Sequence, residues 1–374
     1  MPELPGDDRA IALLTDLVST PSRSGQERAA SERLVAWMAE HGFDAQVDAV
    51  GNAVGVRGTG LREVLLLGHI DTFPGDVPVR RDGDRLYGRG SVDAKGPLCA
   101  FAAAAALDPV PVGWRVTVVG AVEEEAATSR GARHVLEARV PGARPGPPAY
   151  CVVGEPSRWD RVTLGYRGRL VFDIRLRAPF AHSAGAERLP AERGIALWSA
   201  VERYCAEWNA GHDVRDSVFD ALSPSLRTFV TSDEGAFGMV RLGVGVRLPL
   251  AADPETVHRE LTVRLRESAA PGDQVELDIG VLGGEPAYRG GKSNALVRAF
   301  LAEIRARGGA PRFVVKTGTS DMNVVGPFWP RTPIVAYGPG DSALDHTPQE
   351  HVGLAEYLAT IGVLRGVLRR LFAG

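Results

Sequence analysis

Imidazole and carboxylate side chains follow directly on hydrophobic segments of this sequence, and these are residue types that bind zinc and related metal ions. The first group is His69-Ile70-Asp71, which comes after the apolar run 64–67. Because side chains alternate along a strand, His69 and Asp71 point to the same side, where a carboxylate can orient a metal-bound imidazole. Asp93 follows at the end of the glycine-rich segment 88–92. These residues together predict a metal centre.

Three more hydrophobic segments end in groups of the same kind. In chain order they are 114–122 before Glu123-Glu124-Glu125, 149–153 before Glu155, and 332–337 before the loop that contains His346. A run of adjacent acids is usually a solvated loop. Here a buried strand presents the acids at its carboxyl end, which is where open α/β sheets place their sites. We therefore predict that these side chains join His69 and Asp93.

The composition is that of an ordinary globular protein. The 374 residues are 44% hydrophobic and 24% charged, and the net charge of −3 gives no electrostatic case for nucleic-acid binding. The three cysteines (Cys99, Cys151 and Cys205) are scattered, so we interpret them as reduced packing residues. The N-terminus lacks the apolar core of a signal peptide, and no run of about 18 apolar residues predicts a membrane span. We expect a cytoplasmic protein.

The order of helices and strands predicts an α/β fold with two domains. Strands alternate with helices at first, which indicates a largely parallel sheet. The pattern then changes to a βαββαβ-like order, which predicts a small ferredoxin-like α+β domain inserted at 164–282. This domain opens with a hairpin of 162–166 and 170–177. Alternation resumes afterwards, so the domain with the mostly parallel or mixed sheet comprises 1–163 and 283–374.

Local signals predict where three helices begin. Asp7 or Asp8 can cap the first helix, and Ser24-x-x-Glu27 has the pattern of a capping box for the second. A long C-terminal helix is expected from Glu350 to residue 372.

The stretches around the first two site segments resemble a known family. His69-Ile70-Asp71, followed by 88-GRGSVDAKG-96, is similar to the signature of the M20 metallopeptidases and amidohydrolases. The resemblance extends from near residue 10 to the C-terminal helix. It implies a catalytic domain that uses two zinc ions, or cobalt as a substitute, to hydrolyse amide bonds. It also implies that the inserted domain is a lid and dimerisation domain, and that the protein is a homodimer.

The resemblance assigns a role to each candidate residue of the metal centre. Asp93 bridges the two metal ions; the other ligands are His69 and Glu155 for one ion, and a glutamate of the triplet and His346 for the other. Asp71 orients His69. The family has a general base followed by a ligand, which makes Glu124 the base and Glu125 the ligand. The alternative register, with Glu123 as base and Glu124 as ligand, stays open because 126–132 departs from the family pattern.

Other residues match positions that bind the substrate in the family. His182, in Ala181-His182-Ser183, corresponds to the histidine that donates to the oxyanion of the tetrahedral intermediate. Arg247 corresponds to an arginine for the substrate carboxylate, which a guanidinium can bind with two hydrogen bonds. The loop 317-TGTSD-321 resembles the small-residue substrate loop, in which Thr319 and Ser320 offer hydroxyl groups.

Within the family, four stretches resemble the hydrolases that act on the amino-group carrier protein LysW: 68-GHIDT-72, 91-SVDAKGP-97, 154-GEPS-157 and 344-LDHTP-348. The resemblance implies release of lysine or ornithine from the γ-carboxyl of the carrier's terminal glutamate. An arginine-rich set (Arg161, Arg167, Arg169, Arg175 and Arg177) is a hypothetical docking edge for this acidic carrier. N-acetylornithine deacetylase, succinyl-diaminopimelate desuccinylase and aminoacylase are the alternatives within the family. A non-catalytic binding relative and a dinuclear phosphoesterase are the alternatives outside these activities.

Overall fold

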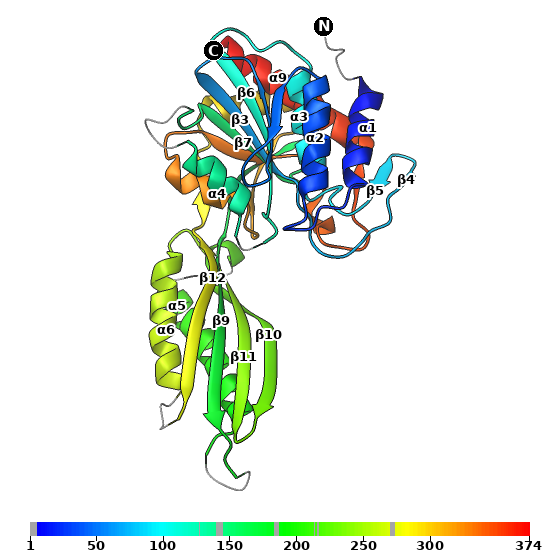
Figure 1. The fold of residues 1–374 in the computed structure, drawn as a ribbon. Helices are drawn as coiled ribbons and strands as arrows, with labels where there is room; N and C mark the ends of the chain where they lie inside the picture. The colour runs from blue at the N-terminus through cyan, green and yellow to red at the C-terminus, as the bar shows by residue number, and fades with distance from the viewer. Residues whose placement is uncertain are drawn as a thin grey trace. The chain divides into compact units, whose positions relative to one another are not determined.

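The computed structural model describes residues 6–126, 128–139, 145–182, 187–212, 214, 217–269 and 274–374. Contacts divide the chain into two compact units, whose elements are labelled in Figure 1. Unit 1 comprises the chain up to Gly165, Arg289–Val315 and Ser320–Gly374; unit 2 comprises Tyr166–Tyr288 and Lys316–Thr319. Unit 2 thus begins near the predicted insertion boundary and ends somewhat later than the sequence suggested. No helix among the described residues is long and apolar enough to cross a membrane.

A mixed sheet forms the centre of unit 1. Its strand order is β1-β2-β6-β3-β7-β15-β8-β13, and β14 also pairs with β8. The central strands β6, β3, β7 and β15 are parallel, whereas β1, β2 and β8 join antiparallel. The strands are β1 (Asp44–Val47), β2 (Ala53–Arg57), β3 (Arg62–His69), β6 (Trp114–Ala121), β7 (Tyr150–Gly154), β8 (Arg161–Tyr166), β13 (Tyr288–Arg289), β14 (Arg312–Lys316) and β15 (Ile334–Tyr337).

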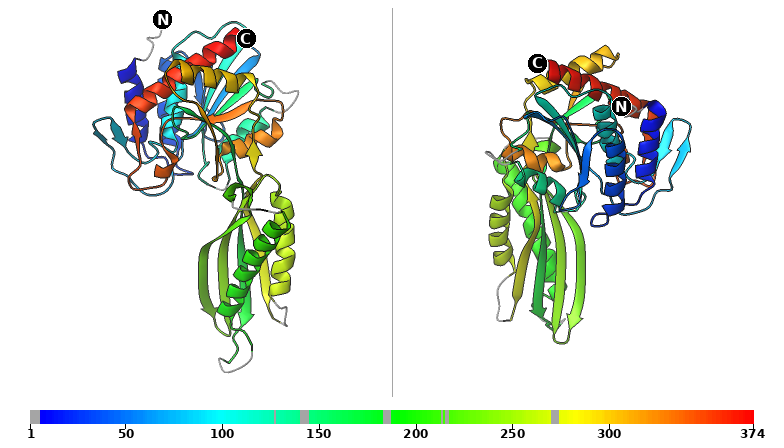
Figure 2. Two further views of the ribbon diagram at one scale, coloured as in Figure 1. Left: turned by 180° about the vertical axis from the view of Figure 1, so that it is seen from behind. Right: turned by 45° about the horizontal axis from the view of Figure 1, so that its top comes forward.

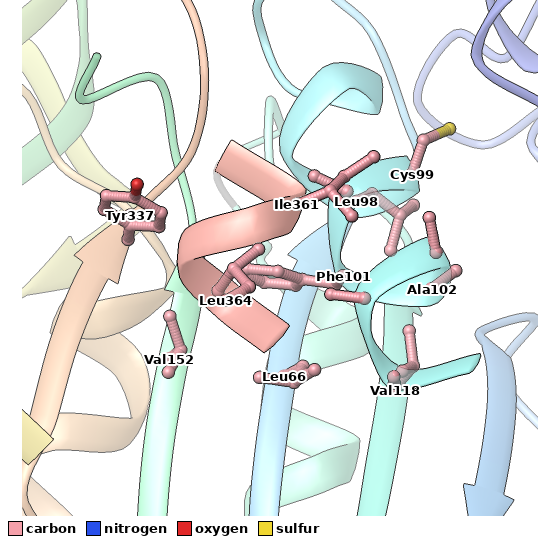
Figure 3. Packing of buried hydrophobic residues seen from close by; sticks show 14 of the residues in the cluster. Leu66, Leu98, Cys99, Phe101, Ala102, Val118, Val152, Tyr337, Ile361 and Leu364 are labelled. Atoms are coloured by element: carbon pink, nitrogen blue, oxygen red, sulfur yellow. The ribbon is translucent and has the colours of Figure 1, made fainter. Parts of the chain in front are cut away.

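Helices pack on this sheet and on one another. They are α1 (Asp7–Val18), α2 (Arg28–Glu40), α3 (Lys95–Ala106), α4 (Arg130–Glu137), α7 (Ala295–Ala306), α8 (Asp321–Val325) and α9 (Leu354–Ala373). Every residue of α3 is buried, because this alanine-rich helix packs on the sheet and against its neighbours α1 and α9 (Figure 3). Phe101 of α3 lies close to Leu66 and Leu364 in the hydrophobic core of unit 1. A Cβ at Gly68 would lie 3.2 Å from the Leu98 Cβ, so the glycine permits the close approach of α3 to β3.

A smaller sheet lies beside the main one and was not predicted. Its order is β16-β5-β4, formed by His351–Gly353, Arg85–Tyr87 and Arg80–Asp82. The expectation that the last helix begins at Glu350 was therefore wrong. The chain first forms β16, and α9 begins at Leu354.

Unit 2 has the predicted βαββαβ order. Its sheet has the strand order β10-β11-β9-β12 and is antiparallel throughout. The helices α5 and α6 both lie on one face of the sheet (Figure 2), where Leu197 and Leu261 are fully buried. The elements are β9 (Gly168–Pro179), α5 (Pro190–Gly211), β10 (Ser223–Glu234), β11 (Phe237–Leu248), α6 (Pro254–Ser268) and β12 (Glu276–Glu285).

Two further local expectations were wrong. The hairpin of 162–166 with 170–177 does not form, because β8 joins the sheet of unit 1 and β9 joins the sheet of unit 2. The first helix is preceded by Gly6 and has no side-chain cap, so Asp7 and Asp8 lie inside its first turn.

Candidate metal centre

The carboxyl ends of the central parallel strands meet at one edge of the unit 1 sheet. β3 ends at His69, which is paired in register with Ala121, the last residue of β6. Gly154, at the end of β7, is paired with Gly68 and Tyr337. The acids that follow β6 and β7 therefore emerge beside His69, as the sequence predicted.

Asp93 lies between the two imidazoles. Its Oδ1 is 3.3 Å from Nε2 of His69, and its Oδ2 is 3.1 Å from Nε2 of His346. His69 comes from β3, and His346 comes from the loop after β15. One carboxylate thus faces two imidazole nitrogens with different oxygens, an arrangement that suits a group between two metal ions.

Glu125 completes a compact ligand cluster on the His346 side. Its Oε1 lies 3.1 Å from Nε2 of His346. Among the described residues, Asp93, Glu125 and His346 offer ligand atoms that all lie within 4.8 Å of one another. His346 itself is partly exposed, and Phe73 stacks on its ring with 4.0 Å between the ring centroids. The cluster is therefore largely buried at Asp93 and Glu125 and reaches the surface of unit 1 at His346.

Asp71 holds the acidic segment in place. Its Oδ1 accepts a hydrogen bond from the Glu124 N–H (3.0 Å), and its Oδ2 accepts from the Glu125 N–H (3.0 Å) and from Oγ of Ser24 (2.7 Å). The Nδ1 of His69 lies 3.4 Å from Oδ1 of the same carboxylate. Asp71 is fully buried. It thus positions an imidazole and the two glutamates together.

The predicted capping box at Ser24 and Glu27 does not form. Ser24 donates to Asp71, and Oε1 of Glu27 accepts from the backbone N–H groups of Gly25 (2.8 Å) and Glu123 (3.2 Å). Both residues of the motif therefore support the acidic segment, whereas α2 has no side-chain cap.

The three adjacent glutamates point to different surroundings. Glu123, at a φ of 59°, accepts hydrogen bonds from Thr128 (2.8 Å) and Arg130 (3.3 Å), outside the cluster. Glu124 is buried, and Glu125 contacts His346. This geometry supports the register in which Glu124 is the base and Glu125 the ligand.

The charges of the centre show an excess of acid that a cation would neutralise. Hydrogen bonds to Asp93 and Glu125 raise the pKa of His346 to about 10 despite partial burial. Burial alone would lower the pKa of His69, but hydrogen bonds to Asp71 and Asp93 raise it well above its usual range. Burial raises the pKa of Glu124, with further repulsion from Glu155. The centre thus favours positive charge beside Asp93 and Glu125, and its nitrogen and oxygen donors are types that bind divalent cations, so the donor set fits a metal centre.

The matching family is one of metallopeptidases. The sequence model of peptidase family M20/M25/M40 matches residues 65–370, a span that contains the whole cluster. The chain belongs to this family. This M20 chain is 45% identical to a "[LysW]-lysine hydrolase" from Deinococcus radiodurans over 381 residues. The aligned region covers 100% of both proteins. As an M20 member it is a metal-dependent amide hydrolase.

Solved structures share this M20 fold. An M20 family metallo-carboxypeptidase from Sulfolobus solfataricus has a TM-score of 0.76 at 17% identity, covering 98% of this chain and 99% of that chain. A dinuclear metal-binding peptidase of the M20 family from Bacillus subtilis has a TM-score of 0.66 at 14% identity, covering 98% of each chain.

Glu155 and the loop around Phe73 complete the surroundings of the M20 centre. Glu155 is buried directly after β7 and acts electrostatically on Glu124. It does not belong to the three-residue ligand cluster found among the described residues. Phe73 and Glu350 were not identified from the sequence. The sequence contains no pattern that indicates the stacking of Phe73 on His346. Glu350 resembled an ordinary acid at the start of a helix.

The predicted substrate residues of unit 2 lie together in part. Nη1 of Arg247 donates to Oγ1 of Thr319 (2.6 Å), and Thr319 donates to the Arg167 carbonyl (3.2 Å). His182 follows β9 in the chain and is exposed. Ser183 and Ala184, which follow it, lie outside the described residues.

Ser320, whose hydroxyl is predicted to contact the substrate, has a structural role in the loop. It belongs to unit 1, is buried, and accepts a hydrogen bond from the Met322 N–H (3.2 Å) as the cap of α8. Its backbone N–H donates to Asn323 (3.0 Å). The cap uses one acceptor position of the hydroxyl and leaves its proton to donate, so the substrate contact of Ser320 stays a prediction.

The hypothetical arginine edge does not exist as five exposed cations. Arg167 is buried, and its guanidinium donates to the Arg247 carbonyl (3.1 Å). Arg169 pairs with Glu285 at 2.7 Å, and Arg177 pairs with Glu276 at 3.0 Å. The fourth and fifth members are Arg161, which belongs to unit 1, and Arg175, which is exposed. Compensated arginines attract an acidic partner weakly, so we withdraw this set as a docking edge.

Proposed function

We propose that this chain is a dinuclear zinc hydrolase that releases L-lysine, and also L-ornithine, from the γ-carboxyl of the C-terminal glutamate of the carrier protein LysW. The observation that carries the hydrolytic centre is the Asp93 carboxylate, which lies between His69 and His346 with Glu125 alongside. Full-length similarity to the D. radiodurans protein supports the choice of substrate. Cobalt is expected to replace zinc, because the same nitrogen and oxygen donors bind both ions.

The proposed ligands divide between two ions that share Asp93. His69 and Glu155 would hold one ion, and Glu125 and His346 would hold the other. When bound, the ions would supply an acidified water and would polarise the scissile carbonyl. Asp71 keeps the His69 ring and the two glutamates oriented through the hydrogen bonds described above.

Glu124 is the proposed general base. Its carboxylate is buried, and desolvation raises its pKa, so it can accept a proton from water and later release it. In the reaction the water oxygen bonds to the amide carbon and the carbon–nitrogen bond breaks. The proton held by Glu124 passes to the departing amine. His182 is the proposed donor to the oxyanion of the tetrahedral intermediate.

Arg247 and Thr319 are the proposed contacts for the carboxylate of the released amino acid. They already bond to each other within unit 2 (2.6 Å), and the Arg167 guanidinium holds the Arg247 carbonyl from below the surface. Burial and the neighbouring Arg247 charge lower the pKa of Arg167 to about 10, so it remains a cation at neutral pH. Two fixed cations favour an anionic group at this place.

The homodimer is proposed to form through unit 2. β10 lies at the edge of the unit 2 sheet, and residues 225–234 are all exposed. An exposed edge strand of this length can pair with the same strand of a second copy. Light scattering on the purified protein tests this, and a monomer at micromolar concentration would contradict it.

The decisive experiment offers three substrates to the zinc- or cobalt-loaded enzyme: carrier-linked lysine, N-acetylornithine and succinyl-diaminopimelate. We expect preferred release of lysine from the carrier. Glu124→Ala should lower kcat by about 10²–10⁴-fold, as loss of a general base does. Glu123→Ala is the matched control, because that carboxylate bonds only to Thr128 and Arg130 among the partners found in the described structure.

Other outcomes change the proposal in defined ways. Preference for a small acyl amine would keep the metal centre and replace the carrier by an N-acyl amino acid. A large loss in Glu123→Ala with an active Glu124→Ala would select the other register. Two bound metal ions without release from any substrate would indicate a binding protein or another amide.

A further inference from the structure

Glu350 is a fully buried carboxylate beside the metal centre that the mechanism above does not use. Its Oε1 accepts hydrogen bonds from the backbone N–H groups of Val92 (3.1 Å) and Asp93 (3.2 Å). Its Oε2 accepts from Nη1 of Arg89 at 2.6 Å. The carboxylate therefore holds the backbone of the residue that lies between both imidazoles.

The position of Glu350 is fixed by the small sheet. It directly precedes β16, whose first residue, His351, is paired with Tyr87 of β5. The Glu350 carbonyl also accepts from the Gly88 N–H (3.3 Å). Strand pairing thus places Glu350 against the glycine-rich segment that leads to Asp93, although the two are far apart in the sequence.

Arg89 extends the same network to the other side of the centre. Its Nε donates to the Gly75 carbonyl (2.9 Å) while its Nη1 binds Glu350. Gly75 belongs to the loop that carries Phe73, and the Phe73 ring lies almost parallel to that of His346, with an interplanar angle of 10°. The ion pair between the partly buried Arg89 and the fully buried Glu350 therefore connects the backbone of Asp93 with the loop that packs on His346.

We infer that Glu350 is a positioning residue of the metal centre: through the Val92 and Asp93 amides and through Arg89, it keeps Asp93 opposite His346. This inference rests on the proposed dinuclear function. A carboxylate is required because donors approach both of its oxygens. A glutamine of equal size would turn its NH₂ either toward the backbone amides or toward Arg89, and in both orientations donors would face donors.

The experiment uses the full chain, stripped of metal by a chelator and then titrated with Co²⁺. The absorption spectrum reports on the ligand geometry, and calorimetry reports on affinity and stoichiometry. The test variants are Glu350→Gln and Arg89→Met. The matched control is Glu63→Gln, because Glu63 is also buried, receives Nε and Nη2 of Arg139 at 3.2 Å, and lies in β3 at the opposite end from His69.

We expect Glu350→Gln to bind the more weakly held Co²⁺ about 10–100-fold less tightly and to change the cobalt spectrum, as loss of groups that orient ligands does. Glu63→Gln should lose stability but keep the parent's affinities and spectrum. If Glu350→Gln does not fold, Arg89→Met carries the test with the same expected direction.

Unchanged affinities and spectra in both folded test variants would overturn the positioning role while leaving the dinuclear centre intact. A parent protein that binds fewer than two Co²⁺ ions would overturn the dinuclear function and the inference with it. The two failures are therefore distinguishable.

Discussion

Replacing Asp71 by Asn keeps the size of the side chain and removes one of its two acceptor oxygens. The native carboxylate receives three donors at 3.0 Å or less, namely the backbone N–H groups of Glu124 and Glu125 and the hydroxyl of Ser24. Nδ1 of His69 lies farther away, at 3.4 Å from Oδ1. The hydroxyl can rotate and accept from the new amide. The two backbone N–H groups cannot adapt, and they approach different oxygens. One of them must face the NH₂ group of the asparagine.

The cost can be worked from these bonds. A buried N–H without a partner costs about 1–3 kcal/mol, and the remaining backbone bond loses roughly 1 kcal/mol of charge assistance. Burial raises the pKa of Glu27, backbone hydrogen bonds oppose this rise, and repulsion from the Asp71 charge adds to it. Removing the Asp71 charge relieves this repulsion and therefore offsets part of the lost stability. The net destabilisation of the metal-free protein is expected to be about 2 kcal/mol.

Urea unfolding in the presence of a chelator measures this difference in the free energy of unfolding. Ser24→Ala is the reference variant, and it should lose about 1 kcal/mol because it removes one of the three donors. The zinc-loaded variant should also lose about 10–100-fold in activity, because His69 and both glutamates are no longer held together. A variant within about 0.5 kcal/mol of the parent, the range of an ordinary surface change, would refute the view that Asp71 organises the acidic segment.

Three further predictions concern stability. Hydrogen bonds from Arg365 hold the pKa of Asp108 below its usual range against partial burial, and Arg369 adds to the effect. This carboxylate therefore stabilises the fold fully above the unfolded pKa of about 3.9, and its contribution disappears as the pH falls further. Asp108→Asn should cost about 1 kcal/mol at pH 7 and progressively less in acid, measured by urea unfolding from pH 7 to pH 3. Gly131→Ala places a Cβ 2.4 Å from a backbone nitrogen and should cost about 1–3 kcal/mol in the same assay, whereas Gly211→Ala, with open space at its Cβ, should be neutral or stabilising. Saturating Zn²⁺ at about 100 times its dissociation constant should raise unfolding stability by about 2.7 kcal/mol, and EDTA should abolish that gain.

The sequence was informative where one local rule had no competitor. The strands before His69, Glu123 and Glu155 are buried on both faces, so they appear as continuous apolar runs, and the acids after them mark the carboxyl edge of the sheet. Asp253 caps α6 by accepting from the Thr256 N–H (2.8 Å), and the proline that follows it suits the first position of a helix.

The sequence misled where a distant group competed with a local one. Ser24 and Glu27 have the spacing of a capping box, but Asp71 and the Glu123 N–H take their hydrogen bonds. Short spacing likewise favoured a hairpin of β8 with β9, but the two strands belong to sheets of different units. Glu350 could not be recognised because its role depends on contacts with Arg89 and Asp93, which only the folded chain brings near.

The discontinuity of unit 1 sets the order in which its parts can form during synthesis. β15 occupies the centre of the large sheet, between β7 and β8, yet it is made after the whole of unit 2. Pairings over such long sequence separations close late, because the chain must first pay the entropy of a long loop. His346 and Glu350 arrive later still. A nascent chain can therefore complete unit 2 once Thr319 has been made, before β15 is available. It cannot assemble the cluster of Asp93, Glu125 and His346 until the segment that contains His346 has left the ribosome.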